Sequence, residues 1–274
     1  MLKQRIITAS ILFVLFLAAL FGLPAIGWQV LVLLLMWLGA AEWVRLSGLG
    51  GRAALGYPVL TTALTAVIMW FDAIASAQAS ALLHLACYIP AVLFWMFVVP
   101  TWLISGWRTQ NSRLMGVVGC VVLIPTGLAL LDLRAFNPWV LLFAMTLVMM
   151  ADISAYFAGK RYGKTKLAPA ISPGKTWEGV FGALLGVSLY VIVVGWASGA
   201  YKEYPVFPSA VVAGWLWVGL AVIGDLFESA VKRQAGVKDS GTLLPGHGGL
   251  LDRIDALTST LPFAAIALVL QRLE

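Results

Sequence analysis

Residues 206–224 read VFPSAVVAGWLWVGLAVIG, an apolar stretch that only Pro208 and Ser209 interrupt, and Asp225 follows it directly. A helix needs about 20 such residues to cross the hydrocarbon core of a bilayer. The stretch therefore predicts a transmembrane helix with a carboxylate near one end. The whole chain has a similar character, because 61% of its 274 residues are hydrophobic and 11% are charged, compared with about 25% charged residues in an average soluble domain.

Apolar runs of this kind recur along the chain, with short polar segments between them. Lipid offers no partner to backbone polar groups, and the alternating segments of about ten residues that build membrane β-barrels are absent, so each run predicts a helix. The expected fold class is all-α, a polytopic transmembrane bundle of about nine helices. The expected spans are residues 6–24, 26–44, 57–76, 80–104, 114–131, 138–158, 177–198, 206–228 and 252–271.

The first span has features of a secretory signal peptide, with Ala18, Ala19 and Ala25 as small residues near a cleavage site. Its apolar run from Ile6 to Ile26 is longer than the usual core of about 7–15 residues, and a second span follows almost at once. We therefore expect a membrane helix here.

Lysine and arginine residues fall mostly on one side of the predicted spans. Of the 18, 15 lie on the side of the amino terminus, and the others are Arg134, Lys202 and Arg272. Since cytoplasmic loops are enriched in these residues, we expect the amino terminus in the cytoplasm and the carboxyl terminus outside. The net charge of +6 then suits an anionic leaflet, and we expect no nucleic-acid binding. Cys87 and Cys120 lie in different spans and are expected to pack rather than form a disulfide.

Polar chemistry concentrates in the second half of the chain. Residues 1–135 have plain, short loops and are expected to form a scaffold that includes candidate dimer contacts. Residues 136–274, with basic cytoplasmic loops at 159–176 and 232–251, are expected to form the catalytic part. Six acids lie in or beside the spans near these loops, where a carboxylate costs about 2.5–3.5 kcal/mol and usually serves a site in the bundle interior. They are Asp152, Glu178, Asp225, Glu228, Asp252 and Asp255.

One helical face carries Asp225, Ser229 and Lys232, so that a carboxylate, a hydroxyl and an ammonium can point into one cavity. Glu228, four positions before Lys232, could instead form an ordinary ion pair that fastens the helix end. Both interpretations stay open for Glu228.

The start of the last span carries Asp252 and Asp255, which share a face and could simply complement the helix dipole. They follow a glycine cluster around His247, in which Gly248 and Gly249 allow the backbone to approach a ligand and present N–H groups to phosphates. Together with Asp225 of the preceding span, with Asp252 and with four basic residues, this glycine cluster predicts a site that binds phosphate and a divalent cation. The basic residues are Lys232, Arg233, Lys238 and Arg253.

The run SAVKRQAGVKDSGTLLPGHGGLLDRID, residues 229–255, resembles the signature of the phosphatidate cytidylyltransferase family in its bacterial form. Two further segments, DISAYFAGKRYGK from residue 152 and SPGKTWEG at residues 172–179, are also similar to family segments. The resemblance covers the second half of the chain well and the first half only as a hydrophobic pattern. The signature positions are Ser229, Lys232, Arg233, Lys238, Asp239, Pro245, His247, Gly248, Gly249, Asp252, Arg253 and Asp255.

The resemblance implies an enzyme that transfers the cytidylyl group of CTP to phosphatidic acid, forming CDP-diacylglycerol and pyrophosphate for phospholipid synthesis. It further implies Mg²⁺ held by Asp225 and Asp252, a second cation such as K⁺ nearby, a homodimer, and a multi-pass location in the bacterial inner membrane with the active site facing the cytoplasm. For His247 we favour a structural or phosphate-contacting role over that of a general acid. Catalytic roles are expected for Asp225, Lys232, Arg233, Lys238, Asp239, His247, Asp252 and Arg253. Substrate-binding roles are expected for Ser172, Lys175, Thr176, Ser229, Gly248, Gly249 and Asp255.

Two other functions remain open. A CTP-dependent kinase of polyprenol or another lipid alcohol would also consume CTP, but would leave no CMP on the lipid. A secondary transporter could use the intramembrane carboxylates as ion sites, although the repeated halves typical of transporters are not evident. The GKT tripeptides at residues 163–165 and 174–176 lack the earlier glycine of a nucleotide-binding P-loop, which disfavours an ATPase.

Small residues predict one close helix contact. Gly179, Gly182 and Gly186 are spaced to let another helix approach, either within one chain or between two.

Overall fold

The computed structural model describes residues 2–200, 207–243, 248–271 and 273. Within these residues, eight helical segments are long and apolar enough to cross a membrane, and a shorter apolar stretch, Ser10–Gly22, precedes them. The predicted all-α polytopic class is therefore confirmed. The helices are α1 (Leu2–Gly22), α2 (Ala25–Ser47), α3 (Gly51–Ile74), α4 (Ala77–Leu93), the π-helix η1 (Phe94–Val98), α5 (Val99–Ser105), α6 (Ser112–Phe136), α7 (Pro138–Tyr162), α8 (Trp177–Ala197), α10 (Phe207–Gln234) and α11 (Leu251–Gln271).

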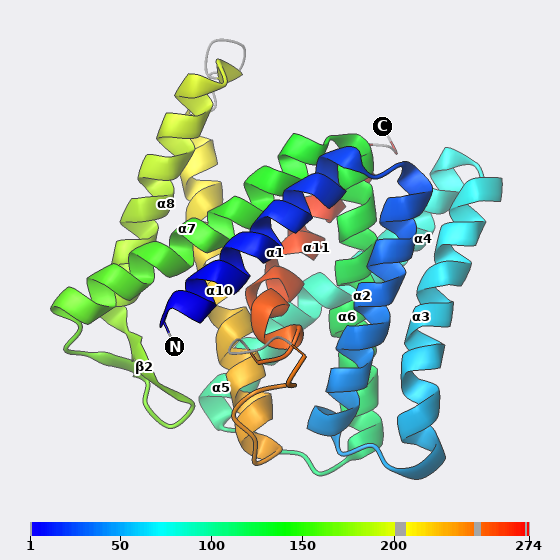
Figure 1. Ribbon diagram of the computed structural model, residues 1–274, viewed down its shortest axis with the longest axis horizontal. Coiled ribbons are helices and arrows are strands. Elements are labelled where there is room, and N and C mark those ends of the chain that lie inside the picture. Colours follow the sequence, from blue (N-terminus) through cyan, green and yellow to red (C-terminus); the bar gives the residue numbers. More distant parts are fainter. Residues whose placement is uncertain (1, 201–206, 244–247, 272, 274) are drawn as a thin grey trace.

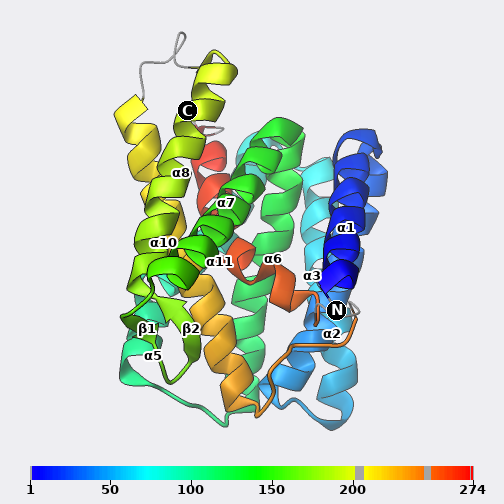
Figure 2. The same cartoon turned by 60° about the vertical axis from the view of Figure 1, so that its left-hand side comes forward.

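Successive long helices run in opposite directions, so the connections gather at two ends of the bundle (Figure 1). One end, which we call the loop end, holds residues 48–50, 106–111, 163–176 and, between α10 and α11, the described residues 235–243 and 248–250. The other, the far end, holds residues 23–24, 75–76 and 137. The turned view in Figure 2 shows the same separation. Both basic loops predicted in the second half of the chain therefore lie at the loop end.

Two local features differ from the sequence prediction. Residues 159–176, expected as a loop, include an antiparallel hairpin of β1 (Lys166–Ala168) and β2 (Ser172–Thr176). The predicted span 80–104 is helical but contains the π turn η1, with Pro90 and Pro100 on either side. Neither proline can donate a backbone hydrogen bond, so regular α-helical pairing is incomplete on both sides of η1.

Aromatic side chains of η1 and α5 pack against α10. Phe94, Trp95 and Trp102 surround Phe227, with ring centroids 5.4 to 5.5 Å from its own and ring planes near perpendicular. Such edge-to-face arrangements are favourable contacts between aromatic rings. Because Phe227 lies between Asp225 and Glu228 in the sequence, this packing fixes α10 beside its two acidic residues.

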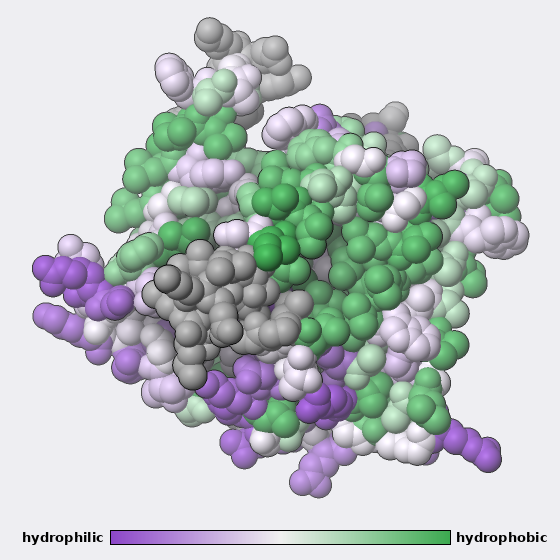
Figure 3. All heavy atoms as spheres, viewed as in Figure 1, coloured by the Kyte–Doolittle hydropathy of each residue, from purple (hydrophilic) through white to green (hydrophobic). Residues whose placement is uncertain are grey.

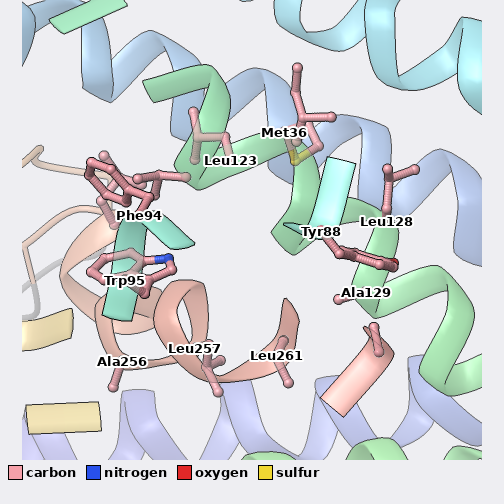
Figure 4. Close-up of a cluster of buried hydrophobic side chains, with 14 of the residues drawn as sticks. Met36, Tyr88, Phe94, Trp95, Leu123, Leu128, Ala129, Ala256, Leu257 and Leu261 are labelled. Atoms are coloured by element: carbon pink, nitrogen blue, oxygen red, sulfur yellow. The ribbon is translucent and has the colours of Figure 1, made fainter. Parts of the chain in front are cut away.

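The main hydrophobic core joins residues from before and after position 135. Figure 4 shows Met36, Tyr88, Leu128 and Leu261 among its members, contributed by α2, α4, α6 and α11. The outer surface is also apolar: Figure 3 shows hydrophobic side chains over much of one face and hydrophilic side chains along its lower edge, at the loop end. A surface of this kind suits contact with lipid rather than with water.

Small residues bring α7 and α8 into close contact. A Cβ atom at Gly182 would collide with Ala158, and one at Gly186 would collide with Ser154. The close contact predicted for these glycines is therefore present, and it lies within one chain.

A buried histidine holds three helices together at the far end. His84 of α4 is 2% exposed; its Nε2 lies 2.8 Å from Asp72 of α3 and its Nδ1 lies 2.6 Å from Asp132 of α6. Tyr88 donates a further hydrogen bond of 2.7 Å to Asp132. No role was predicted for these residues from the sequence, because their partners lie on different helices.

Replacing this histidine is expected to destabilise the fold. In His84→Gln, the carboxylates of Asp72 and Asp132 lose the imidazole that lies between them. Breaking such a buried pairing costs about 3–5 kcal/mol. Thermal unfolding in detergent measures the effect. As a control, Ser80→Ala removes only the outer 2.7 Å bond to Asp72 and is expected to cost about 1 kcal/mol. Equal, small losses in both variants would contradict the bridging role.

Candidate functional site

A cavity of about 540 Å³ lies toward the loop end, between α7, α8, α10 and the hairpin. Its lining is partly polar and partly apolar. The polar lining includes Asp152, Ser172, Lys175, Thr176 and Asp225, and the apolar wall includes Ala151, Ala155, Val180, Ala183, Ala221 and Val222. The cavity can therefore receive a ligand that has both an anionic and an apolar part.

The hairpin directs Lys175 toward this cavity. Thr176 caps the start of α8 with its side chain, and the Glu178 carboxylate accepts the backbone N–H of Thr165 at 3.0 Å. These two contacts tie both strands of the hairpin to α8. Lys175 Nζ then lies 2.7 Å from Asp225 Oδ2, which is an ion pair between the hairpin and α10.

Several carboxylates face the region around Asp225. Ser229 Oγ donates to Asp225 Oδ1 at 3.2 Å, as expected for residues that share a helical face. Asp152 of α7 and Asp255 of α11 are both within electrostatic range of Asp225. This region concentrates negative charge and would favour cationic partners.

Lys232 connects α10 with α11. Its Nζ lies 2.5 Å from Asp252 Oδ1 and 3.3 Å from Glu228 Oε1. Glu228 is 5% exposed, so this lysine provides charge compensation for a buried carboxylate. The ion pair between Glu228 and Lys232 is therefore present, but Lys232 also serves Asp252 on the next helix.

Asp252 organises the loop that precedes α11. Its Oδ2 accepts the Ser240 N–H at 2.9 Å, the Ser240 hydroxyl at 3.0 Å and the Gly249 N–H at 2.8 Å. Gly248 has φ of +79°, the left-handed conformation expected for this glycine cluster. The Gly249 N–H serves the carboxylate here, and its contact with a phosphate stays a prediction.

Glu42 of α2 also reaches this loop, although no role was predicted for it from the sequence. Its carboxylate accepts the Ser240 hydroxyl at 2.8 Å and the N–H groups of Leu250 and Leu251 at 2.8 and 2.9 Å. One signal was available: Glu42 is a carboxylate inside the predicted span 26–44, and such residues are rare without a role.

The other predicted residues are less closely joined. Arg233, Lys238, Asp239 and Arg253 are exposed. Arg253 still lies within electrostatic range of Asp152, and Arg233 Nε lies 3.5 Å from the Ile171 carbonyl. Pro245 and His247 lie outside the described residues, so their predicted roles have no geometry.

The two predicted metal ligands have different partners in this structure, since Asp225 pairs with Lys175 and Asp252 with Lys232. Over residues 2–200, 207–243 and 248–271, no group of three or more His, Cys, Asp or Glu side chains is arranged to hold a metal ion. Mg²⁺ usually takes one or two carboxylates and completes its shell with substrate phosphates and water. The oxygen ligands present therefore fit Mg²⁺ only together with a phosphate substrate.

Comparison with known proteins identifies the family of this chain. The model of the cytidylyltransferase family matches residues 3–271. A phosphatidate cytidylyltransferase of Pseudomonas aeruginosa is 40% identical over 97% of each chain, and one of Haemophilus influenzae is 33% identical over 96% of this chain and 97% of its own. One of Rickettsia bellii is 34% identical over 61% of this chain and 75% of its own. The chain belongs to the cytidylyltransferase family.

Proposed function

We propose that this chain is a phosphatidate cytidylyltransferase, which transfers the cytidylyl group of CTP to phosphatidic acid and releases pyrophosphate. The observation that carries this proposal is the likeness to relatives of that name over almost the full length of both chains. The product is CDP-diacylglycerol, and the substrates are CTP and phosphatidate. The multi-pass fold suits a reaction in which one substrate is dissolved in water and the other in a membrane.

The reaction joins two anionic substrates, so positioning and charge neutralisation supply most of the catalysis. A phosphate oxygen of phosphatidic acid attacks the α-phosphorus of CTP, the bond from that phosphorus to the bridging oxygen breaks, and pyrophosphate leaves. Lys175 and Lys232 stand beside carboxylates on the described site and are suited to neutralise phosphate oxygens. We assign Arg233, Lys238 and Arg253, which are exposed, to attraction and binding of the triphosphate or the lipid headgroup.

The cavity supports a place for the lipid. Its polar part contains Ser172, Lys175 and Thr176, which we assign to the phosphate of phosphatidic acid. Its apolar wall, formed by small side chains of α7, α8 and α10, is suited to the start of an acyl chain. We infer that the lipid enters sideways between the helices.

Asp225 and Asp252 are the residues that we propose to hold Mg²⁺, with a second cation such as K⁺ nearby. Bound there with the substrates, Mg²⁺ would supply charge neutralisation at the reacting phosphates. Lys175 and Lys232 lie beside these two aspartates, where their ammonium groups are suited to contact phosphate oxygens.

We propose that the protein lies in the bacterial inner membrane with the loop end in the cytoplasm, where CTP is available. The charge distribution along the sequence supports this orientation, since 15 of the 18 lysine and arginine residues fall on one side of the predicted spans. A reporter fused after Glu274 is therefore expected to be active only outside the cytoplasm. A cytoplasmic signal from that fusion would mean that the orientation or the number of spans is wrong.

We also propose a homodimer. The family resemblance is the support for this proposal. The glycines of α8 give no further support, because they pack against α7 of the same chain. Light scattering of the purified protein in detergent, with the detergent mass subtracted, measures this state.

One assay separates the proposed function from its alternatives. Purified protein is incubated with phosphatidic acid, a polyprenol, Mg²⁺ and CTP labelled either at the α- or at the γ-phosphate. Cytidylyl transfer places the α-label, and never the γ-label, in the lipid. A lipid-alcohol kinase would place the γ-label in a polyprenol, and a transporter would label neither lipid.

A further inference from the structure

Glu42 of α2 is a carboxylate from the first half of the chain that is built into the loop before α11. It is 8% exposed and accepts three hydrogen bonds of 2.8 to 2.9 Å from Ser240, Leu250 and Leu251. Two of these donors are backbone N–H groups at the start of α11. A carboxylate at that position caps the helix and complements its dipole.

The loop is shaped closely around this carboxylate. A Cβ atom at Gly241 would lie 2.6 Å from Glu42 Oε1, and one at Gly249 would collide with Glu42 Oε2 and with the Ser240 hydroxyl. Larger residues at either position would displace the carboxylate or the loop. The two glycines therefore give Glu42 its access to the backbone of the loop.

Ser240 links this carboxylate to the candidate site. Its hydroxyl lies 2.8 Å from Glu42 Oε2 and 3.0 Å from Asp252 Oδ2. Asp252 in turn holds Lys232, and Lys232 lies beside Glu228. A continuous set of contacts thus runs from α2 through the loop to α11 and α10.

We propose that Glu42 is a positioning residue for cytidylyl transfer, which sets the place of Asp252 and Lys232 by holding the loop and the start of α11. This inference rests on the proposed function. Glu42 does not touch the cavity, so its effect on the reaction passes through Ser240 and the backbone. A displacement of about 1 Å in a reacting group can cost about 10²-fold in rate.

The test compares Glu42→Gln with Trp43→Phe and with the wild-type protein. The glutamine has the same shape, but its amide NH₂ faces donors that need an acceptor. Trp43 is the residue after Glu42 in α2. Trp43→Phe removes the buried hydrogen bond of 2.7 Å from its indole N–H to the Met115 carbonyl and changes no residue of the loop. We expect kcat to fall about 10–100-fold in Glu42→Gln and to stay within about twofold of wild type in Trp43→Phe, measured where all three proteins are folded.

A second comparison separates positioning from stability. Ser240→Ala removes the link between Glu42 and Asp252 but keeps the backbone contacts, so kcat is expected to fall in this variant too. In the Glu42→Gln, Ser240→Ala double variant the loss is expected to be less than the product of the two single losses, because both act through one path. When Trp43→Phe is combined with Glu42→Gln, the loss of kcat is expected to equal the product of the two single losses.

An unchanged kcat in folded Glu42→Gln would overturn the proposal. It would also be overturned if the kcat loss of the Glu42→Gln, Ser240→Ala double variant equalled the product of the two single losses. If Glu42→Gln does not fold, full activity in Ser240→Ala alone would overturn it. Failure of the proposed function gives a different result, since the wild-type protein itself would then place no α-label in phosphatidic acid.

Discussion

Asp225→Asn is expected to lower the rate of cytidylyl transfer by about 10²–10³-fold, the range seen when one charge-stabilising group is removed from an active site. Asp225 is the carboxylate that joins the hairpin to α10 through Lys175, at 2.7 Å, and it accepts the Ser229 hydroxyl. A neutral amide can neither balance that ammonium nor hold a divalent cation. Since the Asp225 side chain is 34% exposed, the fold is expected to tolerate the change.

The matched control is Asp72→Asn, which makes the same substitution at the far end. Asp72 pairs with buried His84, so this variant is expected to lose thermal stability and to keep its rate at temperatures where it is folded. The two variants are compared by initial rates with labelled CTP and by thermal unfolding in one detergent. Full activity of Asp225→Asn would remove Asp225 from the proposed metal site.

Lys232→Met is expected to lose both activity and stability. Its Nζ is shared by Asp252 and Glu228, whose side chains are each 7% exposed. Removing one partner of a buried ion pair costs about 3–5 kcal/mol, because the remaining charge is left uncompensated. Methionine keeps the apolar stem of the side chain as far as Cε, so the loss reports mainly the ammonium rather than the packing.

A double variant distinguishes these two losses. In Lys232→Met, Glu228→Gln, one of the uncompensated carboxylates is removed, while Asp252 keeps its three hydrogen bonds to Ser240 and Gly249. Thermal stability is expected to recover in part, and activity is not. Recovery of activity along with stability would show that Lys232 serves only the fold.

The transmembrane helices could be predicted because a bilayer leaves the chain few alternatives. Apolar stretches such as 206–224 must form helices in lipid, and the structure has α10 at residues 207–234. The hairpin at 166–176 and the π turn at 94–98 were missed. Both depend on local backbone pairing, which hydropathy does not register.

The site was predictable where its residues are neighbours in sequence. Asp225 and Ser229 share a helical face as expected, and the structure joins them by a hydrogen bond. Asp225 and Asp252 come from different helices, and the lysine that each one binds could not be read from spacing. Glu42 and His84 were missed for the same reason, since their partners lie on other helices or loops and no sequence spacing marks them.

The distance in sequence between Glu42 and its partners has a consequence for biosynthesis. Ser240, Leu250 and Leu251 follow Glu42 by 198 to 209 positions, and membrane segments emerge from the ribosome in sequence order. The α2 carboxylate is therefore synthesised and inserted well before any of its donors exists. The loop before α11 can take its final shape only after the start of α11 has been made, so formation of the candidate site is a late step of biosynthesis.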